Sequence, residues 1–192
     1  MDERAYRVLM VIAIVLTVAW VGWSAYDGFW GNRHPGDLAY HAGNNAFEDG
    51  QYGKALQDYD QALRENPGHL WALRGKARAL MQLQRYDEAL RTFNRAIRAE
   101  PAFAAAYANR GILLDRMGRY QAAIGDYEHA LQLDPSLADG PGWLTRFLRL
   151  QPQKPPTIAD RARYLRAELR KPAGERKLRM PEQDAKQRPY KM

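Results

Sequence analysis

A pattern with a period of about 34 residues runs through the middle of the chain and constrains the fold more than any other feature. Pro67, Pro101 and Pro135 stand one period apart. Self-similarity at a fixed period of this length is typical of repeat architectures, in which each unit stacks on the next. Further columns repeat at the same offset: Gly43, Ala77 and Gly111; Tyr52, Tyr86 and Tyr120; Ala55, Ala89 and Ala123; Tyr59, Phe93 and Tyr127; Ala62, Ala96 and Ala130; Leu63, Ile97 and Leu131; Asn66, Glu100 and Asp134.

The spacing of apolar residues within each unit predicts two helices. Ala55, Leu56, Tyr59, Ala62 and Leu63 follow the i, i+1, i+4, i+7, i+8 pattern of a buried helical face. Small residues let two helices cross closely, and the aromatic column fills the space between neighbouring units. Proline cannot continue the second helix, and glycine in the turns can adopt the left-handed conformation that ends a helix. We predict first helices at 36–49, 70–83 and 104–117, and second helices at 52–65, 86–99 and 120–133.

These columns resemble the tetratricopeptide repeat (TPR) family over about Gly36 to Pro135, roughly half of the chain. The departures are mild: Ala39 stands where the family often has Trp or Leu, and Ala77 where it prefers Gly. The resemblance implies an all-α fold, a solenoid of three repeats at 36–69, 70–103 and 104–135.

The last repeat of such a solenoid exposes an apolar face that needs a cover. A short apolar run after Pro141-Gly142 has the i, i+1, i+4, i+5 spacing of a helical face, and it consists of Trp143, Leu144, Phe147 and Leu148. We therefore expect a capping helix within residues 136–150.

The resemblance also implies a function, because members of the family bind peptides or other proteins in a concave groove lined by first helices. Carried over by position, the residues that line the groove are Asp37, Tyr40, Asn44, Trp71, Arg74, Arg78, Ala105, Asn109 and Ile112. Tyr40, Trp71 and Ala105 do not reproduce the lysine and asparagine set with which part of the family clamps chaperone tails. We therefore do not expect chaperone-tail binding.

Trp71, Arg74 and Arg78 form an aromatic and basic stripe at helical spacing. An arginine pair suits an acidic segment or a C-terminal carboxylate, and Asn44 and Asn109 suit a peptide backbone. In the alternative interpretation, Trp71 packs into the repeat interface and the arginines are solvated.

The run from Val8 to Tyr26 contains no charged residue. As a helix its 19 residues span roughly 28 Å, close to the hydrocarbon thickness of a bilayer. We predict a single-pass transmembrane anchor at residues 1–30 and a linker at 31–35. The alternative is a cleaved signal peptide, which needs small residues at the first and third positions before the cut. A cut after Ala25 would place Trp23 at the third position and fits poorly, a cut after Ser24 with Gly22 at the third position is possible, and the apolar run is long for a signal peptide. The aromatic residues expected at the membrane interfaces are Tyr6, Trp20, Trp23, Tyr26 and Trp30.

The charges beside this run predict its orientation. Arg4, Arg7 and the α-amino group precede it, whereas only Arg33 follows within the next dozen residues or so. The positive-inside rule then places the N-terminus in the cytoplasm and the repeats outside, which in a bacterium is the periplasmic side of the inner membrane.

Residues 151–192 form a basic extension with 12 Lys/Arg and 5 Asp/Glu, which accounts for the whole net charge of +7. Prolines in 151–156 predict an extended linker, and Thr157 can cap an amphipathic helix at 158–171. Its apolar stripe is Ile158, Ala162, Leu165 and Leu169, with Arg161, Arg163, Arg166 and Arg170 mostly elsewhere. Residues 172–192 have two interpretations: a disordered tail, or a strap anchored by Leu178, Met180 and Tyr190 along a partner subunit or an anionic surface.

No residue pattern indicates catalysis or metal binding. The chain has no cysteine, and its four histidines lack the i, i+3 or i, i+4 spacing of a helical metal site. Four carboxylates of the second helices are interpreted as a solvated face: Asp58, Asp60, Asp126 and Glu128. We expect no enzymatic activity, no cofactor and no metal. Because the excess positive charge is confined to the tail, we expect no nucleic-acid partner.

Two functions follow from these expectations. The first is a membrane-anchored adaptor or scaffold whose groove binds a client peptide or subunit, in the assembly of an envelope complex. Cytochrome c maturation is one narrower form that no motif here selects. The second is a permanent accessory subunit of a larger membrane complex. A cytoplasmic regulator of an enzyme would need the opposite orientation.

Overall fold

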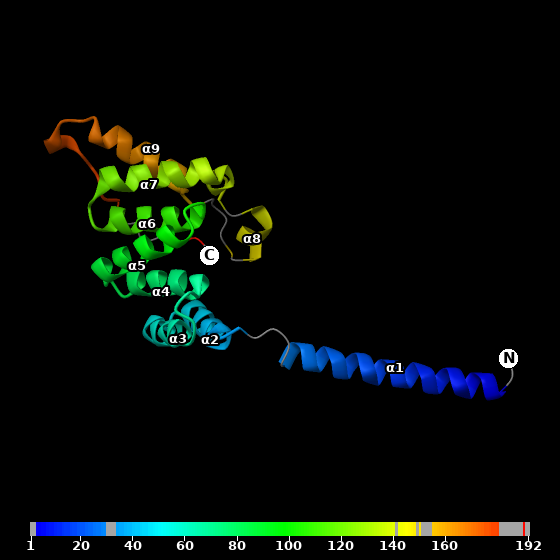
Figure 1. The fold of residues 1–192 in the computed structure, drawn as a ribbon. Helices are drawn as coiled ribbons and strands as arrows, with labels where there is room; N and C mark the ends of the chain where they lie inside the picture. Colours follow the sequence, from blue (N-terminus) through cyan, green and yellow to red (C-terminus); the bar gives the residue numbers. More distant parts are fainter. Residues whose placement is uncertain are drawn as a thin grey trace.

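The computed structural model describes residues 3–29, 34–140, 142–148, 150, 155–180 and 190, and every secondary-structure element within these is helical. A long N-terminal helix, α1 (Glu3–Phe29), projects away from a stack of helical hairpins (Figure 1). The hairpins are α2 (Asp37–Glu48) with α3 (Tyr52–Glu65), α4 (Leu70–Gln82) with α5 (Tyr86–Ala99), and α6 (Ala104–Arg116) with α7 (Tyr120–Leu133). The predicted all-α solenoid is confirmed, and these helices begin and end close to the predicted boundaries.

The turn inside each hairpin places one residue in the left-handed conformation. These residues are Gly50 (φ 75°), Gln84 (φ 59°) and Gly118 (φ 75°). A side chain with a Cβ is disfavoured there, so glycine is the expected residue and Gln84 is the exception. The shared turn geometry gives all three hairpins a similar shape and lets them stack in one direction.

The hairpins are held together by fully buried aromatic rings. Tyr59, Phe93 and Tyr127 have no exposed surface. Tyr59 lies between two glycines: a Cβ added at Gly43 would stand 2.8 Å from its ring, and one added at Gly75 would stand 2.5 Å from it. Gly75 belongs to the second hairpin, so this aromatic side chain fills the space between the first hairpin and the next. The sequence identified Gly43 in a repeated column but not Gly75.

The cap of the solenoid differs from the expectation. Helix α8 (Trp143–Leu148) forms where it was predicted, yet Trp143 is 72% exposed and Phe147 is 70% exposed. The last hairpin is instead covered by α9 (Ile158–Leu169), which packs on α7 and buries Ile158 and Leu165. In Figure 1, α9 lies along α7 while α8 stands to the side.

Local chemistry explains where α9 begins. Thr157 and Asp160 form a reciprocal capping box, in which each side chain accepts a hydrogen bond from the other residue's backbone N–H. The backbone hydrogen bond from Thr157 is also the main cause that lowers the pKa of Asp160. Two short 3₁₀ turns, η1 (Pro135–Ala138) and η2 (Ala173–Glu175), flank the α8–α9 region.

Helix α1 makes no core with the hairpins. Its segment Tyr6–Tyr26, 21 residues long, is long and apolar enough to cross a membrane, and none of it is buried. The predicted interface aromatics Tyr6, Trp20, Trp23 and Tyr26 are all exposed, whereas Trp30 lies outside the described residues.

Replacing Gly75 by Ala is expected to destabilise the stack by about 1–3 kcal/mol, because the new methyl group overlaps the Tyr59 ring. The matched control is Gly125→Ala in α7, where an added Cβ meets nothing within 4 Å. Relief of glycine's backbone entropy there is expected to leave stability unchanged or raise it by about 0.5–1 kcal/mol. Thermal unfolding of the full chain in mild detergent, followed by circular dichroism, measures both. Equal melting temperatures for Gly75→Ala and the parent chain would contradict the packing described.

Candidate functional site

The predicted groove residues occupy equivalent positions on the first helices of the hairpins. Asp37, Trp71 and Ala105 share one position of the repeat, and Asn44, Arg78 and Ile112 share another. We call the surface that carries them on α2, α4 and α6 the first-helix face. The structure gives these residues unequal roles, since some are exposed, some hold the hairpins together, and some are covered by the C-terminal extension.

The most accessible part of this face is an aromatic and cationic cluster at the start of α4. The Trp71 side chain is 47% exposed, and its ring meets that of Phe103 edge-on at 6.0 Å between centroids. The Arg74 guanidinium lies 3.6 Å from the Phe103 centroid and 4.8 Å from that of Trp71. Arg74 is fully buried and pairs with Glu100. It is therefore a cation stacked between rings, neither solvated nor freely exposed.

Arg78 lies one turn further along α4 and is also buried, with 7% of its surface exposed. Its guanidinium stacks 4.2 Å from the centroid of Phe47 on α2. No carboxylate in the described part of the chain forms an ion pair with Arg78, and its Nε has no hydrogen-bond acceptor there. Burial lowers the pKa of Arg78, partly opposed by nearby Tyr59 and Glu48.

The predicted groove residues on α2 make contacts within the first hairpin and with the start of the second. The Tyr59 hydroxyl donates to Asn44 Oδ1 at 2.8 Å, and burial raises the pKa of Tyr59 well above its usual value. The Ala72 amide donates to His69 Nδ1 at 3.2 Å, which leaves Nε2 to donate to Asp37 Oδ1 at 3.1 Å. The Tyr40 ring contacts that of His69 in a tilted arrangement, with 5.0 Å between ring centroids.

On the third hairpin, the C-terminal extension covers Asn109. Asn109 and Ile112 are fully buried. The Asn109 carboxamide binds the backbone of Tyr190: Nδ2 donates to the Tyr190 carbonyl at 3.1 Å, and the Tyr190 N–H donates to Oδ1 at 2.7 Å. The sequence predicted that Asn109 suits a peptide backbone, but it did not identify this segment as the occupant.

A buried ion pair fastens the extension to the same hairpin. Arg161 donates to both carboxylate oxygens of Asp115, at 2.7 and 2.8 Å, and to the Leu178 carbonyl at 3.0 Å. The Tyr127 hydroxyl donates to Asp115 at 3.2 Å. The sequence placed Arg161 off the apolar stripe and did not single out Asp115. The residue spacing within a single helix cannot show that an arginine is buried when the carboxylate that neutralises it lies on another helix.

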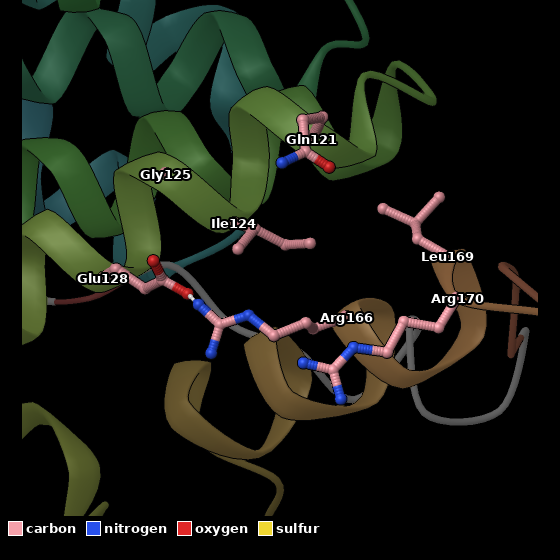
Figure 2. A pocket seen from close by; sticks show the side chains of 7 residues that line it. All are labelled: Gln121, Ile124, Gly125, Glu128, Arg166, Leu169 and Arg170. Carbon is pink, nitrogen blue, oxygen red and sulfur yellow. Dashed lines mark ion pairs between the residues drawn. The ribbon is translucent and has the colours of Figure 1, made fainter.

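Three of the four carboxylates interpreted as a solvated face instead form ion pairs between helices. Asp126 accepts from Arg110 at 2.7 Å and is buried, and Asp60 pairs with Lys76 at 2.6 Å. Glu128 pairs with Arg166 across a shallow pocket between α7 and α9 (Figure 2). That pocket is lined by Gln121, Ile124, Gly125, Glu128, Arg166, Leu169 and Arg170, and Arg170 reaches its rim in Figure 2.

Among the described residues, no group of three or more His, Asp or Glu side chains is arranged to hold a metal ion. The stacked hairpins and the side chains on their first helices suit the binding of another protein instead. A stack of hairpins that presents a row of aromatic, cationic and amide side chains from its first helices is the architecture of a protein-interaction scaffold.

Comparison with known proteins identifies the repeats of this scaffold. Family models of the tetratricopeptide repeat match residues 46–109 and 104–137, which cover the end of α2 and α3 to α7, and they support tetratricopeptide repeats in this part of the chain. The Arabidopsis OM64 TPR domain is similar, with 27% identity, a TM-score of 0.51, and coverage of 52% of this chain and 83% of that one. A search of the curated proteins gives no match to the sequence.

Two further solved structures are similar, and both contain a peptide. The first TPR of Spaghetti (RPAP3), bound to the HSP90 peptide SRMEEVD, is 19% identical with a TM-score of 0.58 and covers 73% of this chain and 97% of that one. The second TPR of the same protein, with the same peptide, is 25% identical with a TM-score of 0.50 and covers 52% and 93%.

Proposed function

We propose that this chain is a membrane-anchored adaptor whose first-helix face binds a segment of a protein partner that carries a negative charge. The observation that supports this most directly is Arg78, a buried cation with no ion-pair partner in the described part of the chain. Removing a charge from water is costly unless a counter-charge or hydrogen bonds replace the lost solvation. A carboxylate supplied by a bound segment would provide that counter-charge.

Arg74 and Trp71 extend the same site. The Nε and Nη1 groups of Arg74 are buried without acceptors in the described structure, although Nη2 pairs with Glu100. Trp71 offers an exposed aromatic surface beside them, and tryptophan and arginine are enriched among the residues that dominate binding energy at interfaces. Peptide binding by the second TPR of Spaghetti supports a peptide as the ligand class.

An array of immobilised heptapeptides, in acidic, neutral and basic sets with free or amidated C-termini, tests this site. We expect the purified full chain to prefer acidic peptides, and Arg78→Gln to lose about tenfold or more in affinity because the bound carboxylate loses its charged partner. Arg98→Gln on α5, an exposed arginine of a second helix, serves as the control and should bind like the parent chain. Binding that is insensitive to peptide charge and to Arg78 would refute the proposal.

The anchor is proposed from α1, because a 21-residue apolar helix with no buried surface needs a non-aqueous environment. Its flanking charges favour a cytoplasmic N-terminus and periplasmic repeats in the inner membrane of a bacterium.

We expect the chain to stay in membranes washed with alkaline carbonate, and protease added to spheroplasts to digest the repeats. Val15→Arg should release a substantial fraction, since arginine at the centre of a span costs about 2.5–3.5 kcal/mol. Val15→Leu is the matched control. Recovery of a soluble chain that lacks the apolar segment would indicate a signal peptide instead, and protection of the repeats would indicate the opposite orientation.

The second candidate is a permanent accessory subunit, which the exposed aromatics of α8 favour because they leave surface for a fixed neighbour. Mild-detergent co-purification with mass spectrometry separates the two. For an adaptor in the assembly of an envelope complex, we expect a sub-stoichiometric partner that is lost when Trp71→Ala and Arg78→Gln are combined. Membrane subunits at a fixed ratio, unaffected by the double variant, would favour the accessory subunit.

A further inference from the structure

Tyr190 is held on the first-helix face in the way that a bound peptide would be. The carboxamide of Asn109 pairs with both the N–H and the carbonyl of this one residue. In an extended chain, these two groups point to the same side, so one amide side chain satisfies both as a neighbouring strand would. These contacts do not depend on the side chain of the bound residue, so Asn109 can hold any extended segment.

The Tyr190 side chain provides the selective part of the contact. Its hydroxyl donates to the Leu137 carbonyl at 3.3 Å and accepts from the Ile158 amide at 3.4 Å. Leu137 belongs to η1 and Ile158 begins α9, so the ring lies where these two elements meet and packs against the hydrophobic core. Burial raises the pKa of Tyr190. A smaller side chain would leave this space and both backbone groups without a partner.

This contact continues the row of residues proposed to bind a partner. Asn109 occupies the repeat position that Gly75 has on α4, and Ile112 occupies the position of Arg78. Tyr190 therefore lies on the hairpin next to the Trp71–Arg74–Arg78 cluster, on the equivalent helix. A ligand that runs along the first helices from α4 to α6 would reach the place that Tyr190 occupies.

The rest of the extension is fixed separately. The Tyr164 hydroxyl donates to the Lys177 carbonyl at 2.6 Å, and the Lys177 amide donates to Glu168 at 2.7 Å. Together with the pair of Arg161 and Asp115, these bonds hold residues 177 and 178 on α9 without any contribution from Tyr190. Release of Tyr190 would leave α9 and the cap in place.

We propose that Asn109, with Leu137 and Ile158, forms a binding site for an extended segment that contains a tyrosine, and that the chain's own Tyr190 fills this site until a partner's segment displaces it. The inference deepens the proposed function, on which it rests, by naming the class of segment that the third hairpin accepts. Tethering gives the cis segment an effective concentration of about millimolar, so a partner's segment must either bind more tightly or gain further contacts at the Trp71–Arg74–Arg78 cluster.

The probe for this site is a fluorescent peptide with the sequence of residues 186–192, measured by anisotropy on the full chain in detergent. We expect Tyr190→Ala to bind it about tenfold or more tightly than the parent chain does, because the competing cis segment is weakened. Combining Tyr190→Ala with Asn109→Ala should abolish the gain. As a control, Tyr190→Ala combined with Asn45→Ala should keep the gain in affinity, because Asn45 is an asparagine of α2 away from this site. Equal affinity of the parent chain and Tyr190→Ala would overturn the proposal.

A change in the peptide alone guards against an Asn109 variant that fails to fold. A probe with an N-methylated tyrosine lacks the N–H that donates to Asn109. We expect its affinity for the Tyr190→Ala chain, in which Asn109 is intact, to be about tenfold or more lower than that of the unmethylated probe. Undiminished binding would exclude Asn109 as the backbone acceptor. The acidic-peptide site is tested with acidic heptapeptides and Arg78→Gln, whereas this site is tested with the 186–192 peptide and Tyr190→Ala, so the failure of either proposal can be told apart from the failure of the other.

Discussion

The contact between the buried Tyr59 ring and the glycines around it sets how the first two hairpins stack. Tyr59 fits between Gly43 of its own hairpin and Gly75 of the next, with no room for another carbon atom at either glycine. Such close packing fixes the distance and the rotation between hairpins, because a packed interior does not deform continuously. The first helices are thereby aligned, and residues one period apart come to lie in rows on one face. The proposed binding face is a consequence of this interior packing.

On the first-helix face, Arg78 is a buried positive charge that no carboxylate in the described part of the chain neutralises. The other buried charges of the described structure each have an oppositely charged partner, such as Asp126 with Arg110 and Arg161 with Asp115. Arg78 rests on an aromatic ring, which offers a weaker and less directional compensation than a carboxylate. A repeat protein needs no such residue for stability, since neighbouring hairpins could pack there with an apolar side chain. This contrast is why we assign the α4 cluster to recognition.

The helices and their order were predictable because their signals are local. Within one unit, the positions of Tyr59, Ala62 and Pro67 predict a helix and the residue at which it ends. Three copies of this pattern make the prediction of helices unambiguous. The cap was harder. Helices α8 and α9 both carry apolar residues at helical spacing, and only the capping box and the greater length of α9 distinguish them. The stacking of Arg74 on Phe103 joins α4 to the residue before α6, and the contact of Tyr190 with Asn109 spans 81 residues. The repeat period places the helices, but it does not say which side chains become partners.

Asp115 has a consequence for how the solenoid comes apart. It accepts a hydrogen bond from Tyr127, the aromatic residue inside the third hairpin, and it neutralises Arg161 of the cap. In a linear array of repeats the terminal unit has one neighbour fewer and tends to fray before the others. Here a single carboxylate couples the interior of the last repeat to the helix that covers it, so the two should open together. The end of the array then behaves as one cooperative block that joins the third hairpin to α9.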